Sequence, residues 1–148
     1  MKIGAALASG LIGAGVLTLV HEVARRNIDA APRMDILGMR AIAQGAEMAG
    51  ETPPSRDTLF DMAMVGDIVF NALYYSLVAW GGPQGAARRG ALLGLAAGVG
   101  GVVLPGRFGL GDRPSARTKA TQAMTIAWYT IGGLAAAAAF QRLGQENE

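Results

Sequence analysis

Four long apolar stretches constrain the fold of this chain more than any other feature of its sequence. They cover residues 3–20, 59–80, 91–104 and 120–140, and polar loops that carry arginine separate them. A helix needs about 17 to 25 residues to cross the hydrocarbon core of a bilayer, so three stretches are long enough and the third is marginal. The third gains length if Arg88 and Arg89 extend their charges back to the headgroups, which starts its helix near Ala86.

The pattern predicts an all-α, polytopic integral membrane protein with a single four-helix transmembrane domain over residues 1–148. We expect the spans at about residues 3–24, 57–80, 86–104 and 118–142. A soluble helical domain is the alternative, but 51% hydrophobic residues and a mean hydropathy of +0.31 favour lipid. The first stretch follows Lys2 directly, as in a signal peptide, but it is longer than the apolar part of one. We therefore expect it to remain as the first span.

The loop between the first two spans is too long for a simple connection. Apolar residues recur near one face of a helix over residues 34–49, which predicts a short interfacial helix in this loop. Gly50 and the prolines after it end that helix. The second span then begins near residues 55–58, where Thr58 and Asp61 have the spacing of a capping box.

The distribution of lysine and arginine between the loops predicts the orientation, because these residues are retained on the cytoplasmic side. Nine cations lie at the loops after the first and third spans: Arg25, Arg26, Arg33, Arg40, Arg56, Arg107, Arg113, Arg117 and Lys119. Four lie on the opposite side: Lys2, Arg88, Arg89 and Arg142. We expect a bacterial inner-membrane protein with both termini outside the cytoplasm.

Composition excludes several classes of function. The chain has no cysteine and one histidine, so it offers no disulfide, no thiolate metal site and no cysteine nucleophile, and we expect neither a metal nor a cofactor. The segment from His21 to Arg25 is not a zinc motif, because arginine stands where the second histidine would be. No basic helix or aromatic-basic strip is present, so we expect no nucleic-acid partner.

Asp67 is the residue that most needs an explanation. It lies nine residues beyond Thr58, hence about 13 Å along the second span, where an aspartate costs about 2.5 to 3.5 kcal/mol. Such a residue usually faces the bundle interior and has a partner. We expect an intramembrane polar cluster formed by Asp67, Asn71, Gln122, Thr125, Tyr129, His21 and Arg25.

Three interpretations of this cluster remain open. It is a structural hydrogen-bond network that fixes helix register, or Asp67 carries a proton or cation in a small transporter or channel, with His21 as a relay. The third interpretation is a membrane enzyme that acts on a lipid or quinone-like molecule through His21 and Glu22. No nucleophile elbow, metal triad or carboxylate pair supports the third, so we assign no catalytic residue.

Small residues recur at four-residue spacing and allow two helix backbones to approach closely. They are Ser9 with Gly13 on the first span, and Gly90, Gly94 and Gly98 on the third. This spacing is typical of packing within one bundle and also of a self-association face.

The glycine-containing loop over residues 105–119 carries Arg107, Arg113, Arg117 and Lys119. It lacks the strand and the Gly-Lys-Ser/Thr ending of a nucleotide-binding loop, so we expect contacts with anionic lipid headgroups rather than ATP. Taken together, the sequence favours a non-catalytic subunit of a membrane complex or a self-associating helical bundle. Its expected partners are membrane lipids and other membrane subunits or further copies of itself.

Overall fold

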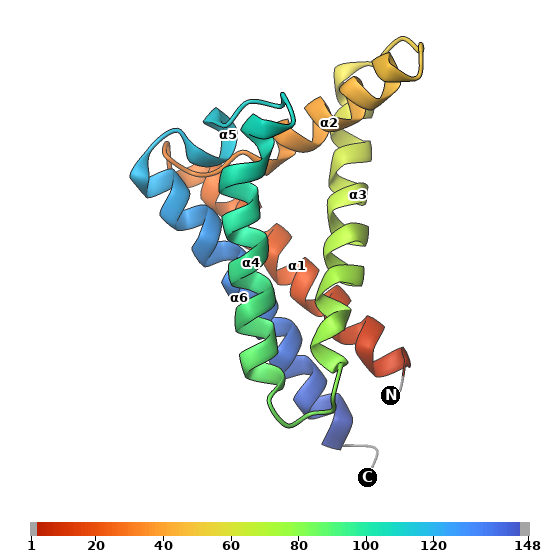
Figure 1. The fold of residues 1–148 in the computed structure, drawn as a ribbon, viewed down its shortest axis with the longest axis vertical. Helices are drawn as coiled ribbons and strands as arrows, with labels where there is room; N and C mark the ends of the chain where they lie inside the picture. The colour runs from red at the N-terminus through yellow and green to blue at the C-terminus, as the bar shows by residue number, and fades with distance from the viewer. Residues whose placement is uncertain (1–2, 146–148) are drawn as a thin grey trace.

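The computed structural model describes residues 3–145, and every regular element in that range is a helix. The prediction of an all-α chain is confirmed there, and four helices are long and apolar enough to cross a membrane. Lys2, one of the cations counted above, lies outside the described residues. The elements, labelled in Figure 1, are α1 (Ile3–Asn27), α2 (Met34–Met48), α3 (Arg56–Tyr75), the 3-10 helix η1 (Ser76–Ala79), α4 (Ala86–Arg107), α5 (Arg113–Ala116) and α6 (Lys119–Gln145).

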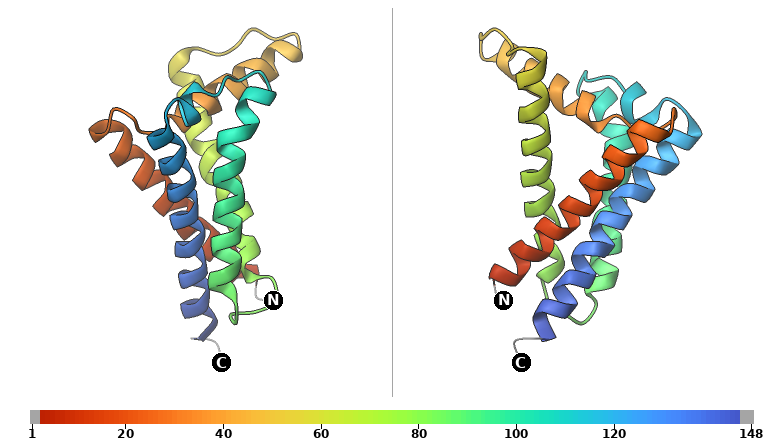
Figure 2. Two further views of the ribbon diagram at one scale, coloured as in Figure 1. Left: turned by 60° about the vertical axis from the view of Figure 1, so that its left-hand side comes forward. Right: turned by 180° about the vertical axis from the view of Figure 1, so that it is seen from behind.

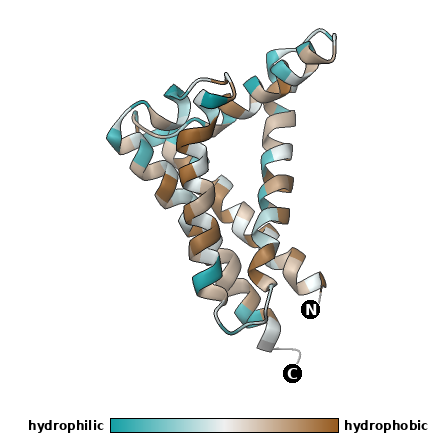
Figure 3. Ribbon diagram, in the orientation of Figure 1, coloured by the Kyte–Doolittle hydropathy of each residue, from teal (hydrophilic) through white to brown (hydrophobic). Residues whose placement is uncertain are grey.

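The four long helices form a V rather than a closed bundle. Helices α4 and α6 run side by side, and α1 crosses from α3 to α6 (Figures 1 and 2). Helix α3 meets α4 near the turn that joins them and diverges from it toward the opposite end. We call the end of the molecule at this turn the narrow end and the opposite end the wide end. At the wide end, α2 extends from α5 to the start of α3, and hydrophilic residues gather there (Figure 3).

Both ends of α3 differ in detail from the sequence pattern. The N-cap is Ser55, whose hydroxyl accepts a hydrogen bond of 3.3 Å from the backbone N–H of Thr58. The expected cap at Thr58 is therefore replaced by one three residues earlier. The α-helix ends at Tyr75 and tightens into η1, and Gly81 and Gly82 then adopt positive φ angles of 82° and 86°, which glycine adopts without strain.

The α4 glycines face α6 of the same chain. A Cβ atom placed on Gly94 would lie 2.5 Å from the Cα of Thr130, and one on Gly98 would lie 2.6 Å from the Cα of Ile126. Gly90 likewise meets the backbone of Gly133. Because α6 already covers this face, the row of glycines is not available to a second copy of the chain.

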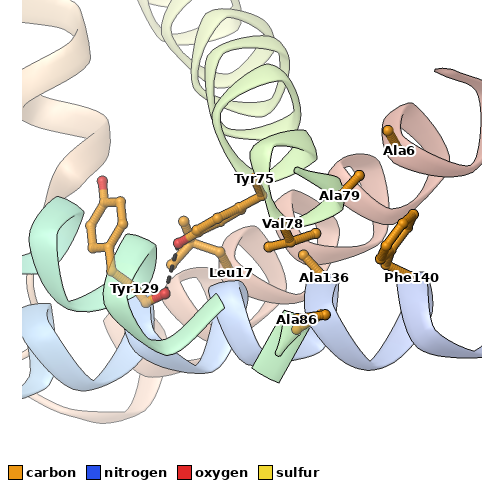
Figure 4. Packing of buried hydrophobic residues seen from close by; sticks show 10 residues of the cluster. Ala6, Leu17, Tyr75, Val78, Ala79, Ala86, Tyr129, Ala136 and Phe140 are labelled. Carbon is orange, nitrogen blue, oxygen red and sulfur yellow. Dashed lines mark hydrogen bonds between the residues drawn. The ribbon is translucent and has the colours of Figure 1, made fainter. Parts of the chain in front are cut away.

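Helix α1 packs through its own small residues. A Cβ atom on Gly13 would lie 2.7 Å from Ala136 of α6, and Gly10 meets the backbone of α3 at Ala72. Ser9 is fully buried, and its hydroxyl donates a hydrogen bond to the carbonyl of Ala5. Where α1, η1 and α6 meet, Tyr75 is buried and donates a hydrogen bond of 2.7 Å to the carbonyl of Tyr129 (Figure 4). The tightly packed core therefore lies toward the narrow end.

Candidate functional site

A cavity of about 480 Å³ occupies the opening between α3 and α4, and we call it the cleft. Most of its lining is apolar and comes from both helices and the loop after α4. The polar side chains in the lining are Asp67, Asn71, Tyr74 and Tyr129. Asp67 is the only charged one, so the cleft is an apolar space with a single acidic group.

A second cavity of about 390 Å³ lies between α2 and α3, and we call it the roof cavity. Leu37 and Ile42 of α2 and Met62 of α3 contribute to its apolar lining. The cleft and the roof cavity share four lining residues: Asp67, Phe70, Pro105 and Leu110. Asp67 therefore stands where the two apolar cavities adjoin.

Asp67 has a hydrogen-bond partner but no counter-ion. Asn71, one turn farther along α3, donates its side-chain N–H to Oδ1 of Asp67 at 2.9 Å and to the Asp67 backbone carbonyl at 2.9 Å. The ion pairs within residues 3–145 involve other acids. The Asp67 carboxyl group thus meets an apolar cavity on two sides without a neutralising cation.

Asp67 also lines a small, partly enclosed cavity of about 20 Å³, which we call the polar chamber. Its polar lining comes from three helices: Thr18, His21, Glu22 and Arg25 of α1, Asp35 of α2 and Asp67 of α3. The His21 residue is only 8% exposed, and its ring meets the ring of Tyr129 edge-on at 5.7 Å. Neither Nε2 of His21 nor Oγ1 of Thr18 has a hydrogen-bond partner within the described part of the chain.

Two ion pairs border the chamber toward the wide end. Arg25 holds the carboxylate of Glu22 with two hydrogen bonds of 2.6 Å, and its guanidinium lies 5.7 Å from the ring centroid of Phe60. Arg33 holds Asp35 with hydrogen bonds of 2.9 and 2.7 Å. Burial raises the pKa of the Asp35 carboxyl, but the hydrogen bonds and charge of Arg33 outweigh it and leave that pKa below its usual value.

Two residues of the expected cluster lie elsewhere. Gln122 donates to the carbonyl of Ala116 at 3.1 Å, and Thr125 donates to the carbonyl of Ser115 at 2.8 Å. Both side chains therefore fasten α5 to α6 and do not line the cleft, the roof cavity or the polar chamber. Tyr129, one turn beyond Thr125, is the α6 residue of the expected cluster that lines the cleft.

Helix α2 holds the loop after α4, an arrangement that the sequence did not reveal. Arg40 donates to the carbonyl of Leu110 at 2.7 Å, and Gln44 donates to the carbonyl of Phe108 at 3.3 Å. Asp35 and Phe70 were also missed as site residues, because their place depends on where α2 lies relative to α3. The i, i+4 spacing of Asp67 and Asn71, by contrast, is visible in the sequence.

The four loop cations are exposed at the wide end: Arg107, Arg113, Arg117 and Lys119. None of them forms an ion pair with another residue in the range 3–145. Within that range no group of three or more histidine and acidic side chains is arranged to hold a metal. His21 and Glu22 share only the polar chamber, which has room for a water molecule but not for a lipid or quinone.

The comparisons with known proteins leave this geometry as the guide to function. No known protein family matches the chain, and no curated protein or solved structure is significantly similar to it.

Proposed function

We propose that this protein is a four-span inner-membrane protein that binds a lipophilic cation in the cleft, with Asp67 as the anchor for the positive charge. One observation carries the proposal: the carboxyl group of Asp67 has no counter-ion among residues 3–145 and lies where two apolar cavities adjoin. This proposal develops the transport interpretation of Asp67 rather than the enzymatic one.

The dimensions and lining of the cleft support a ligand of this class. Ligand pockets usually measure about 300 to 1,000 Å³ and combine an apolar lining with a few placed polar groups. The cleft has about 480 Å³ and a mostly apolar lining. The apolar groups of such a cation fit that lining, while its positive charge would pair with Asp67.

The energetics of a buried carboxylate suggest coupling to protons. An unpaired charge in a membrane interior is costly, so such an acid is either protonated or paired with a cation. In the absence of ligand, burial therefore favours the protonated form of Asp67. A cationic ligand that enters the cleft replaces that proton, so that binding releases one proton.

Binding of tetraphenylphosphonium to the purified protein in nanodiscs tests the proposal. Asp67→Asn keeps the size of the side chain and removes the charge, and we expect it to weaken binding about tenfold or more, or about 1.4 kcal/mol. Asp61→Asn is the matched control, because Asp61 is an exposed acid of the same helix outside both cavities. Equal affinity of Asp67→Asn and the unaltered protein would reject the proposal.

A second candidate is the non-catalytic subunit of a membrane complex. It is favoured by the outer flank of α3, which exposes Val65, Val69 and Leu73. A partner helix that packs there would cover these apolar side chains. The mass of the native protein, extracted gently from its own membrane, tests this candidate: a stoichiometric foreign chain supports it, and a pure monomer contradicts it. Self-association through Gly90, Gly94 and Gly98 is no longer proposed, because α6 covers them.

The wide end is proposed to face the cytoplasm. The predicted excess of cations there supports this orientation. It would bring α2 to the membrane interface and would bring Arg107, Arg113, Arg117 and Lys119, which lie between the end of α4 and the start of α6, to the level of anionic headgroups.

A further inference from the structure

We infer that the polar chamber binds one water molecule, and that this water passes protons between Asp67 and His21. The inference rests on the proposed function, since it supplies the route by which Asp67 loses the proton that a cationic ligand replaces. It also gives the chamber a purpose that is distinct from that of the cleft.

The chamber has the size and the chemistry of a water site. A cavity needs about 10 to 15 Å³ to hold a water molecule, and a buried water makes about three hydrogen bonds to polar groups that otherwise lack partners. The chamber has about 20 Å³. Nε2 of His21 and Oγ1 of Thr18 are buried without a partner, and Asp67 provides a carboxyl group on the same lining.

The chamber lies between the cleft and the charged surface at the wide end. Asp67 lines both the cleft and the chamber, so it can take part in ligand binding on one side and proton exchange on the other. Glu22 also lines the chamber, and its side chain is 21% exposed. The lining of the chamber thus includes both Asp67 of the membrane-spanning part and a partly exposed side chain.

Among the bases that line the chamber, His21 is the one that can accept a proton from the water. Glu22 and Asp35 face His21 but are held as carboxylates by Arg25 and Arg33. Tyr129 meets His21 from α6 through its ring. Of the chamber's bases, Nε2 of His21 is therefore the one without a partner in the described chain.

The transfer is balanced in atoms and charge. The O–H bond of protonated Asp67 breaks as the water accepts that proton, and the water passes one of its own protons to Nε2 of His21. The water is regenerated, Asp67 becomes a carboxylate, and His21 becomes an imidazolium beside Glu22 and Asp35. The carboxylate on Asp67 is then free to pair with the ligand.

Infrared spectroscopy of the ligand-free protein in nanodiscs tests the inference. The carbonyl band of the protonated Asp67 carboxyl is identified by its loss in Asp67→Asn, and its shift after transfer to D₂O measures the rate of proton exchange. We expect Thr18→Val combined with His21→Phe to slow this exchange about tenfold or more, a rise of about 1.4 kcal/mol in the barrier. Thr18→Val alone, a nearly isosteric change, should also slow it.

Ser115→Ala is the matched control, because Ser115 has another buried hydroxyl without a partner in the described chain, outside the chamber. It should leave the exchange rate unchanged. Exchange in the Thr18 and His21 variants as fast as in the unaltered protein would overturn the inference, as would the lack of any carbonyl band that Asp67→Asn removes. Because no ligand is present, a failure to bind tetraphenylphosphonium would reject the proposed function and leave this result standing.

Discussion

At the scale of single residues, the ion pair between Arg33 and Asp35 ties the start of α2 to the rim of the polar chamber. Asp35 has a side chain that is only 5% exposed, whereas that of Arg33 is 35% exposed. We expect Asp35→Asn to lower the free energy of unfolding by about 1 kcal/mol, because solvent screens the exposed partner. Thermal unfolding in mild detergent measures this loss, and Asp29→Asn, an exposed acid in the preceding turn, should cause none.

The ion pair between Arg33 and Asp35 also makes the stability of the protein depend on pH. The pKa of Asp35 is lower in the folded protein than its usual value of 3.8, so the folded state favours the charged form. The contribution of the Asp35 carboxylate to the free energy of unfolding is complete above pH 3.8, and it is lost as the pH falls through the lower pKa of the folded state. The Tm difference between the unaltered protein and Asp35→Asn should therefore shrink below pH 3.8. A difference that grows on acidification would contradict this assignment.

Arg89 joins the two sides of the turn between α3 and α4. Its guanidinium donates to the carbonyls of Val78 at 2.9 Å, Gln84 at 3.1 Å and Gly82. Arg89→Lys keeps the charge, but the lysine cannot reach all three carbonyls. We therefore expect this variant to lower the free energy of unfolding by about 1 to 3 kcal/mol, as measured by thermal unfolding. Arg88→Lys, at an exposed neighbour, is the control. Equal stability of both variants would mean that Arg89 contributes only its charge.

At the scale of elements, the contact between α4 and α6 depends on glycine. A Cβ atom on Gly94 would lie 2.5 Å from the backbone of Thr130. Such overpacking costs about 1 to 3 kcal/mol, more than the roughly 1 kcal/mol that alanine gains over glycine in a helix. Gly94→Ala should therefore lower the Tm of the protein. Gly100→Ala, where the nearest atom is 3.5 Å away, should keep or raise it, and the reverse order would reject this account of the seam.

The lengths of the helices could be predicted from the sequence, but their relative placement could not. Apolar stretches bounded by glycine, proline and charge indicate where each helix begins and ends to within a few residues, and Asp67 and Asn71 share a face because they are four residues apart. Whether Thr125 meets Asp67 or Ser115 depends on how α5 folds back on α6. The divergence of α3 from α4, which creates the cleft, has no local signature because it depends on tertiary packing, in which α1 crosses from α3 to α6.

At the scale of the whole molecule, close packing and open space are separated along the long axis. Backbone contacts through glycine and the buried Tyr75 hold the narrow end together. Toward the wide end α3 diverges from α4 and packs against α2, and Asp67 lies where the cleft and the roof cavity adjoin. The ligand that we propose would therefore enter beside α3, away from the closely packed core of the narrow end.

The orientation of this asymmetric molecule decides from which side Asp67 exchanges protons. The described cations at the narrow end are Arg88, Arg89 and Arg142, against nine at the wide end, so the wide end should face the cytoplasm. The natural chain has no cysteine, which makes single-cysteine labelling unambiguous. In intact bacterial cells an impermeant maleimide should label Gln84→Cys at the narrow end, and it should label Glu51→Cys at the wide end only after permeabilisation; both positions are exposed. The opposite pattern would invert the orientation and move the proton route to the outer face. Labelling of both positions in intact cells would place them on the same side of the membrane. It would then contradict a single crossing of the membrane by α3, which lies between them.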